Sequence, residues 1–145
     1  MLMVCTGNIC RSPTMEAVFR ARATRLGIDI EFDSAGTESQ HVGEPPDPRS
    51  QEAARGRGYE LSHLRARRVR APVDFERFDR ILAADRSHLA WLTSRCPPEH
   101  RAKLALVLDD TDLPDPYYGE AEDFHAVLDA VEAAAERWLR SAESA

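Results

Sequence analysis

Residues 5–12 read Cys-Thr-Gly-Asn-Ile-Cys-Arg-Ser, between a short apolar run at residues 2–4 and a helical pattern that opens after Pro13. A strand that feeds a tight loop and then a helix gathers backbone N–H groups in one concave place, where they and the helix's positive end attract an anion. The same field stabilises a thiolate at Cys5. The planar guanidinium of Arg11 matches a tetrahedral oxyanion. A nucleophile, an anion cradle and a cation thus fall within seven residues.

The neighbouring residues favour this interpretation over an ordinary buried cysteine at a strand end. Gly7 and Asn8 tolerate the positive φ that a loop needs when it folds its amides inward. Ser12 and Pro13 are residue types that begin helices. With these neighbours, Cys5 is better explained as a nucleophile than as a packing residue.

Two other kinds of site fit the loop less well. A zinc site on Cys5 and Cys10 would need a second close pair of ligands, and the remaining cysteine, Cys96, stands alone before Pro97. A nucleotide cradle would carry Gly-x4-Gly-Lys followed by Ser or Thr, a pattern that the sequence lacks. We therefore expect an anion site with no metal and no cofactor.

Length and composition limit the class of protein. The chain has 145 residues, 43% hydrophobic and 30% charged, which suits one globular domain spanning residues 1–145. A formal net charge of −6 disfavours nucleic-acid binding, and no apolar run reaches membrane-spanning length. We see no signal peptide, and three cysteines make no disulfide framework, so we expect a cytoplasmic protein without membrane insertion.

Short apolar runs alternate with helical patterns along the chain. The expected strands are residues 2–4, 28–33, 80–84 and 104–108. The expected helices are residues 13–26 and 49–57, one that begins at Asp85 to Ser87, and one with an apolar stripe from Phe124 to Trp138. Residues 34–48 and 109–123 have loop composition. This order predicts an α/β fold with a parallel sheet and helices on both faces.

The acidic loop after the last expected strand supplies a second half for the site. Ligands of open parallel sheets bind at the carboxyl ends of the strands, where this loop and the Cys5 loop both lie. Asp115 is the best candidate for a proton donor, and Pro116 biases it toward an extended conformation. Tyr117 and Tyr118 suit the walls of a cleft for a flat aromatic substrate. The alternative is a solvated acidic loop; its carboxylates do not match the calcium-binding EF-hand spacing.

Four segments together resemble the low-molecular-weight protein tyrosine phosphatases over nearly the whole chain. They are Val-Cys-Thr-Gly-Asn-Ile-Cys-Arg-Ser-Pro at 4–13, Asp-Ser-Ala-Gly-Thr at 33–37, Leu-Ser-His at 61–63 and Asp-Pro-Tyr-Tyr-Gly at 115–119. The resemblance implies a four-stranded parallel sheet flanked by helices. It also implies metal-independent hydrolysis of protein phosphotyrosine and of small aryl phosphates.

The resemblance assigns roles to the residues of the site. Cys5 attacks phosphorus and forms a phosphocysteine, and Asp115 protonates the phenolic oxygen and later activates water. The phosphate is held by the guanidinium of Arg11 and by the backbone amides of Thr6, Gly7, Asn8, Ile9, Cys10 and Arg11. The hydroxyl of Ser12 donates to the sulfur of Cys5.

Supporting residues follow from the same resemblance. Asn8 is expected to hold a strained loop through hydrogen bonds that reach Ser34 and His63. Asp85 matches an acidic position near the family's site, or it simply caps the following helix. Gln40 falls where relatives often carry an aromatic residue that lines the substrate cleft, so this chain has no aromatic side chain at that position of the cleft.

The remaining interpretations concern reactivity, alternative functions and partners. Cys10 either packs as a small apolar residue or captures oxidised Cys5 as a disulfide. The arginine run at residues 65–70 is either a solvated basic face or a docking patch. Two alternative functions remain. One is an arsenate reductase, which would need further cysteines beyond Cys96, and the other is a catalytically silent phosphotyrosine-binding module. The expected partner is a phosphotyrosine-containing protein, with a cognate tyrosine kinase among the candidates, and the expected state is a monomer or weak dimer.

Overall fold

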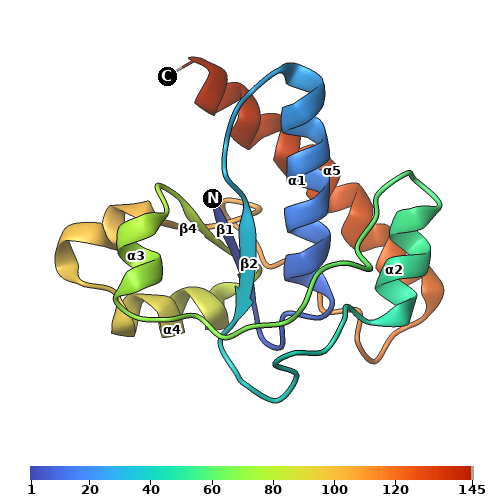
Figure 1. Ribbon diagram of the computed structural model, residues 1–145, viewed down its shortest axis with the longest axis horizontal. Helices are drawn as coiled ribbons and strands as arrows, with labels where there is room; N and C mark the ends of the chain where they lie inside the picture. Colours follow the sequence, from blue (N-terminus) through green and yellow to red (C-terminus); the bar gives the residue numbers. More distant parts are fainter. Residues whose placement is uncertain (145) are drawn as a thin grey trace.

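The structure of the protein is a computed structural model that describes residues 1–144. It contains one parallel sheet of four strands in the order β2-β1-β3-β4, as the sequence predicts (Figure 1). The strands are β1 (Leu2–Cys5), β2 (Asp33–Gly36), β3 (Ile81–Ala83) and β4 (Leu104–Leu106). The loops that follow all four strands therefore begin at the same edge of the sheet.

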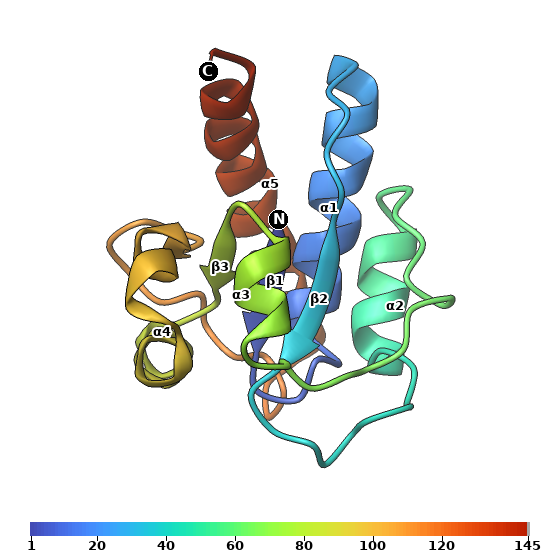
Figure 2. The same cartoon turned by 60° about the vertical axis from the view of Figure 1, so that its left-hand side comes forward.

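Helices cover both faces of this sheet, which confirms the predicted architecture (Figures 1 and 2). The helices are α1 (Arg11–Leu26), α2 (Pro48–Arg55), α3 (Val73–Arg77), α4 (Arg86–Arg95), the 3₁₀ helix η1 (Pro98–Lys103) and α5 (Ala121–Ser144). Helices α1, α2 and α5 pack together on one face, and α4 packs against β3 and β4 on the other. None of the helices within residues 1–144 is both long and apolar enough to cross a membrane.

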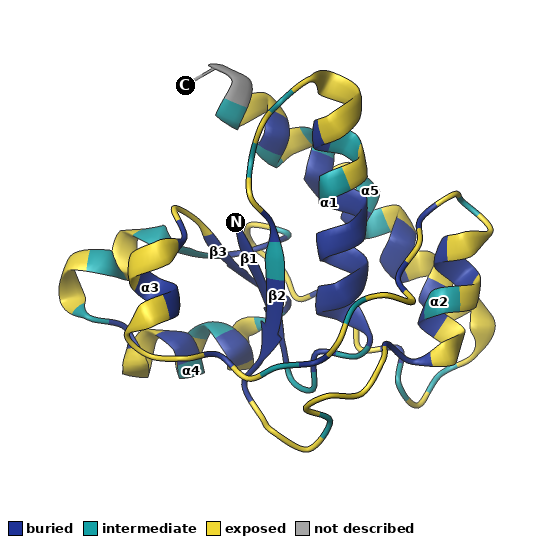
Figure 3. Cartoon of the chain, in the orientation of Figure 1, coloured by how far each residue is buried: buried dark blue, intermediate teal, exposed yellow. Residues whose placement is uncertain are grey.

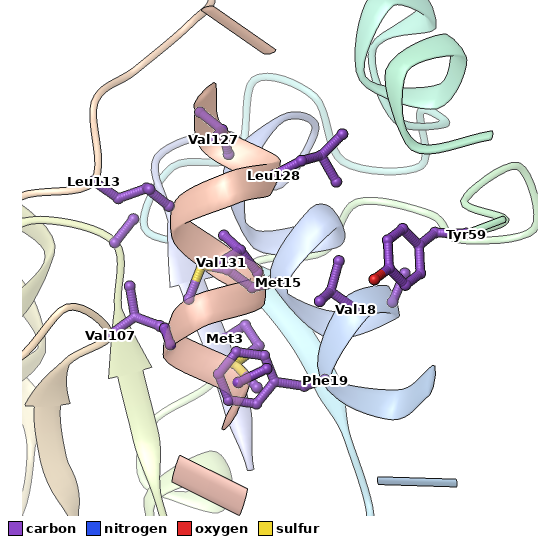
Figure 4. Packing of buried hydrophobic residues seen from close by; sticks show 14 of the residues in the cluster. Met3, Met15, Val18, Phe19, Tyr59, Val107, Leu113, Val127, Leu128 and Val131 are labelled. Atoms are coloured by element: carbon purple, nitrogen blue, oxygen red, sulfur yellow. The ribbon is translucent and has the colours of Figure 1, made fainter. Parts of the chain in front are cut away.

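Two hydrophobic clusters fill the space between the sheet and its helices. Figure 3 marks the buried residues, and Figure 4 shows part of the larger cluster. Alternate side chains of β1 point to opposite faces, so Met3 and Cys5 join the larger cluster and Leu2 and Val4 the smaller one. The larger cluster packs α1 against α5 through residues that include Met15, Phe19, Val127 and Val131. Cys5 thus ends the central strand on the face that α1 covers.

The second strand differs from its prediction. Residues 28–32 pair with no strand, although Ile28 and Ile30 pack against the larger cluster, and the paired strand β2 begins at Asp33. Residues 34–36, predicted as loop, instead pair with β1 in the register Met3 to Ser34 and Cys5 to Gly36. A Cβ at Gly36 would lie 2.5 Å from the carbonyl oxygen of Thr6, so only glycine permits this approach. The small residues of this strand lack the apolar pattern that predicts a strand, but they allow it to pack close to the Cys5 loop.

The other differences concern element ends and short helices. Strands β3 and β4 are shorter than predicted, α1 begins at Arg11, α2 covers Pro48–Arg55, and α5 begins at Ala121. The short elements α3 and η1 were not predicted because neither carries a helical stripe of sufficient length. Helix α4 begins as predicted, because the side chain of Asp85 accepts hydrogen bonds from the backbone N–H groups of Ser87 and His88.

Candidate active site

In the part of the chain that the structure describes, the loop between β1 and α1 leaves its amides unpaired while its carbonyls are bonded to other segments. The carbonyl oxygens of Cys5, Thr6 and Ile9 accept hydrogen bonds from the backbone N–H groups of Thr37, Glu38 and Asp47. The backbone N–H groups of residues 6–10, by contrast, donate to no acceptor within the described chain. Five such donors beside a helix N-terminus form a binding site for an anion.

The loop needs Asn8 and Gly7 for different reasons. Asn8 has a φ of 59°, the left-handed conformation that asparagine tolerates better than most residues. Gly7 was predicted to supply positive φ, but it is not among the residues with that conformation. A Cβ there would lie 2.8 Å from Cδ2 of His41, so Gly7 provides room for the imidazole instead.

Cys5 is buried at the floor of this loop, only 3% exposed. Its sulfur lies 3.0 Å from the hydroxyl oxygen of Ser12 and 3.4 Å from the backbone nitrogen of Ser12, whose N–H donates to it. The amide of Asn8 donates to the same hydroxyl oxygen at 2.7 Å. Because that oxygen accepts from Asn8, the hydroxyl proton of Ser12 is free to point at the sulfur. The two donors favour the negative charge of a thiolate.

Asn8 connects the loop to β2 and to the segment before α3. Its amide donates to the hydroxyl of Ser34 at 2.9 Å, and its side-chain oxygen accepts the backbone N–H of Arg67 at 3.0 Å. The expected bond to His63 is wrong, because His63 is exposed and Arg67 occupies that place with its backbone. A hydrogen bond from a backbone N–H cannot be predicted from residue types in the sequence.

Arg11 is buried, 3% exposed, and its guanidinium contacts two segments, Asp85 and the loop after β4. Its Nη1 donates to the Asp85 carboxylate at 2.9 Å and to the carbonyl oxygen of Leu113 at 2.8 Å. Its Nη2 lies 3.7 Å from the Asp115 carboxylate. The structure therefore brings the acidic loop after β4 to the Cys5 loop.

A cleft of about 190 Å³ opens above Cys5. It is lined by loop residues Cys5, Thr6, Gly7, Ile9, Cys10 and Arg11, by Gln40 and His41, and by Asp115, Tyr117 and Tyr118. The two tyrosine rings meet edge to face, with centroids 4.9 Å apart, and Tyr118 is 94% exposed. The remaining predicted site residues do not line this cleft: Asn8, Ser12, Ser34, His63 and Asp85.

Comparison with known proteins assigns the chain to a protein family. A sequence model for the low molecular weight phosphotyrosine protein phosphatases matches residues 1–145. The chain belongs to this family. It is 44% identical over 142 aligned residues to a low molecular weight protein-tyrosine-phosphatase of Streptomyces coelicolor, covering 90% of this chain and 85% of the relative. The sequence-based resemblance is confirmed, and the chain is a protein tyrosine phosphatase.

Solved structures agree with this assignment. The crystal structure of a protein tyrosine phosphatase from Entamoeba histolytica matches with a TM-score of 0.95 at 36% identity, covering 99% of this chain and 96% of that one. The Vibrio vulnificus protein Wzb, solved in complex with benzylphosphonate, matches with a TM-score of 0.87 at 28% identity, covering 97% and 96% of the two chains.

Asp85 of this phosphatase combines the two roles that its sequence position suggested. It caps α4, and it forms the ion pair with Arg11. Burial opposes ionisation of Asp85, but hydrogen bonds from Ser87 and Arg11 and the nearby His88 outweigh burial and lower the pKa to about 2. Arg11 therefore keeps an ionised partner across the physiological pH range.

Sequence reasoning missed three contributors to the site. His88 hydrogen-bonds the hydroxyl of Thr6 at 2.7 Å, His41 lines the cleft, and Arg49 donates to the carbonyl oxygen of Tyr117 at 2.8 Å. The contacts of His88 and Arg49 form only through tertiary packing, and no local sequence motif predicts them. The arginine run is also partly structural, because Arg67 forms ion pairs with Asp33 and Asp74 at 3.0 and 2.9 Å.

The third cysteine of the phosphatase is remote from the other two. Cys96 lies in the smaller hydrophobic cluster, whereas Cys5 and Cys10 belong to the larger cluster on the opposite face of the sheet. This separation disfavours the relay of electrons along cysteines that an arsenate reductase requires. Among residues 1–144, no group of three or more His, Cys, Asp and Glu side chains is arranged to hold a metal ion.

Proposed function

We propose that this phosphatase hydrolyses protein phosphotyrosine through a covalent phosphocysteine at Cys5. The observation that carries the proposal is the Cys5 sulfur at the start of a loop with five unpaired amides, with two donors from Ser12 at 3.0 and 3.4 Å. A phosphate seated on those amides places phosphorus directly above the sulfur. The thiolate attacks phosphorus in line while the phenolic oxygen departs on the far side.

The charge of the transferring group is stabilised by groups that the chain itself supplies. The loop amides and the guanidinium of Arg11 hold the equatorial oxygens, and their positions are fixed before substrate arrives. Asp85 and the carbonyl of Leu113 hold Nη1 of Arg11. We propose that these donors make a metal ion unnecessary for the reaction.

Asp115 is the proposed general acid for the departing phenolic oxygen. Its carboxyl lines the cleft, is half exposed, and lies 3.7 Å from Nη2 of Arg11. After the phenol leaves, the resulting carboxylate removes a proton from the water that attacks the phosphocysteine. Ser12 stabilises the departing thiolate in this second step.

The lining of the cleft supports an aryl phosphate as substrate. Tyr117 and Tyr118 contribute aromatic rings to the lining, and Gln40 and His41 contribute polar side chains. The similar Wzb protein binds benzylphosphonate, a phosphonate on an aromatic group. A phosphotyrosine side chain of a protein has the same combination, and a tyrosine kinase that phosphorylates itself is one candidate substrate.

Hydrolysis of p-nitrophenyl phosphate tests this proposal. We expect no turnover by Cys5→Ser and an unchanged rate when a chelator is added. Asp115→Asn should lower kcat by roughly 100- to 10,000-fold, the usual contribution of general acid–base catalysis, with the larger losses for poorer leaving groups. Asp110→Asn, an exposed acidic residue of the same loop, is the matched control. Robust activity of Cys5→Ser would refute the proposal.

A further inference from the structure

Thr6 and His88 form a hydrogen bond that the proposed reaction does not use. Thr6 follows the nucleophile and lines the cleft, and its hydroxyl oxygen lies 2.7 Å from Nε2 of His88. His88 belongs to the first turn of α4 and is only 2% exposed. A buried titratable ring therefore joins the phosphate-binding loop to the beginning of α4.

The backbone of Asp85 fixes the tautomer of this ring. Nδ1 of His88 accepts the backbone N–H of Asp85 at 3.2 Å. A nitrogen that accepts a hydrogen bond carries no proton, so the proton of the neutral imidazole is on Nε2. His88 therefore donates to Thr6, and the oxygen of Thr6 is the acceptor.

The hydroxyl of Thr6 must then donate its proton to another acceptor. No second hydrogen bond of this hydroxyl is formed within the described chain. The backbone of Thr6 is held as well, because its carbonyl oxygen accepts the N–H of Glu38 at 3.0 Å. The cleft above Cys5, which Thr6 lines, is where an acceptor for this proton would arrive.

We propose that His88 is a positioning residue for the phosphatase reaction: as the Nε2–H tautomer it fixes the side chain of Thr6 and makes the Thr6 hydroxyl a hydrogen-bond donor to the phosphoryl group in the cleft. This inference rests on the proposed function of that cleft. Asp85 and His88, which cap α4 together, thereby hold the two ends of the loop, Arg11 through the carboxylate and Thr6 through the ring.

The surroundings of His88 keep it in the required neutral form. Burial lowers the pKa of His88, and the positive charge of Arg11 acts in the same direction. The carboxylates of Asp85, Asp115 and Asp112 oppose this effect without overcoming it. A protonated ring could not accept the N–H of Asp85, because Nδ1, which lies 3.2 Å from a carboxylate oxygen of Asp85, would then carry a proton of its own. The donor to Thr6 would lose its fixed orientation.

Two substitutions of His88 test its pair of hydrogen bonds, and substitutions of Thr6 separate positioning from helix capping. Glutamine can accept the Asp85 N–H through its side-chain oxygen and donate to Thr6 through its nitrogen, whereas methionine can do neither. We expect His88→Met to lower kcat/KM for p-nitrophenyl phosphate roughly 3- to 10-fold, the effect of one neutral hydrogen bond, and His88→Gln to stay within about twofold of wild type. Thr6→Val should lose as much as His88→Met, whereas Thr6→Ser should retain activity.

A double variant of Thr6 and His88, and the tautomer of the His88 imidazole, give two further tests of the proposal. Thr6→Val with His88→Met should be no slower than either single variant, because both remove the same donor. Losses that multiply would show that His88 acts independently of Thr6, and failure of glutamine to restore activity would show that these two hydrogen bonds do not explain the effect of His88; either result overturns the proposal. Nitrogen NMR of the wild-type ring, which does not depend on the phosphocysteine, should find the proton on Nε2 at neutral pH. A proton on Nδ1 overturns the proposal even if Cys5 proves to be the nucleophile.

Discussion

The guanidinium of Arg11 lies 3.7 Å from the carboxylate of Asp115, so one arginine joins the Cys5 loop to the acidic segment after β4. The same guanidinium is held on its other side by Asp85 at 2.9 Å. Arg11 therefore orients two halves of the site that come from distant parts of the sequence. Its planar fork, and not only its charge, makes this arrangement possible.

Substitution of Arg11 by lysine should therefore be costly although the charge is kept. A single ammonium cannot reach Asp85, the carbonyl of Leu113 and a phosphoryl oxygen together. We expect Arg11→Lys to lower kcat/KM for an aryl phosphate by roughly 100- to 1,000-fold, as loss of a fixed oxyanion donor does. Arg25→Lys, at an exposed position of the same helix, should be neutral. A loss below tenfold in Arg11→Lys would contradict this role.

The strained conformation of Asn8 predicts an unusual order of stabilities. Asn8→Ala loses the hydrogen bonds to Ser12, Ser34 and Arg67 and must also adopt a φ of 59°. We expect it to lower the free energy of unfolding by about 3 kcal/mol. Asn8→Gly loses the same bonds without the conformational strain and should be about 1 kcal/mol more stable than the alanine variant. Urea unfolding measures both, and an alanine variant at least as stable as the glycine variant would be the contrary result.

Asp85 predicts how the protein responds to acid. Its pKa falls from 3.8 to about 2 on folding, so between these values the unfolded chain binds more protons than the folded one. The stabilisation is complete above about pH 4 and is lost as the pH falls toward 2, by about 2 kcal/mol in total. Asp85→Asn should lack this part of the pH dependence, whereas Asp110→Asn should keep it. Unfolding by urea between pH 2 and 6 measures the difference, and identical slopes for Asp85→Asn and wild type would exclude this origin.

Cys10 should protect Cys5 from irreversible oxidation. Burial and the nearby Asp47 carboxylate raise the pKa of Cys10 to about 12, so it is a thiol at neutral pH. Peroxide would convert Cys5 to a sulfenic acid, and the sulfur of Cys10 would then attack it, losing its proton and releasing water as the disulfide forms. After peroxide and then dithiothreitol, wild type and Cys96→Ser should recover activity and Cys10→Ser should not. Full recovery of Cys10→Ser would reject this protection.

Arg67 should matter for stability more than its basic neighbours do. Its guanidinium contacts Asp33 and Asp74, and the Asp74 side chain is only 4% exposed. Arg67→Ala leaves that buried carboxylate without its cation, so we expect a loss of about 3 kcal/mol in the free energy of unfolding. Arg70→Ala, whose side chain is on the surface, should change it by less than about 0.5 kcal/mol. Equal effects of the two substitutions would contradict the role assigned to Arg67.

The sequence predicts the parts of the site that lie in continuous motifs. The loop from Cys5 to Ser12 carries its chemistry in adjacent residues, and the alternation of strands and helices places Asp115 at the same edge of the sheet. Strand β2 was misplaced because Asp-Ser-Ala-Gly has no apolar alternation, and its pairing depends on close packing against the loop. The hydrogen bond from Asn8 to Ser34 was predicted and is confirmed. The bond from the backbone N–H of Arg67 to Asn8 and the bond between His88 and Thr6 escaped prediction, because these groups reach the loop only after the chain has folded.

The covalent intermediate offers the most direct test of the proposed chemistry. Wild-type protein would be mixed with p-nitrophenyl phosphate, quenched in acid within one turnover, digested and analysed by mass spectrometry. We predict phosphate on the peptide that contains Cys5, formed with the burst of p-nitrophenol and lost as inorganic phosphate appears. A burst-free reaction in which no phosphate is found on Cys5 during turnover would contradict nucleophilic catalysis by this thiol.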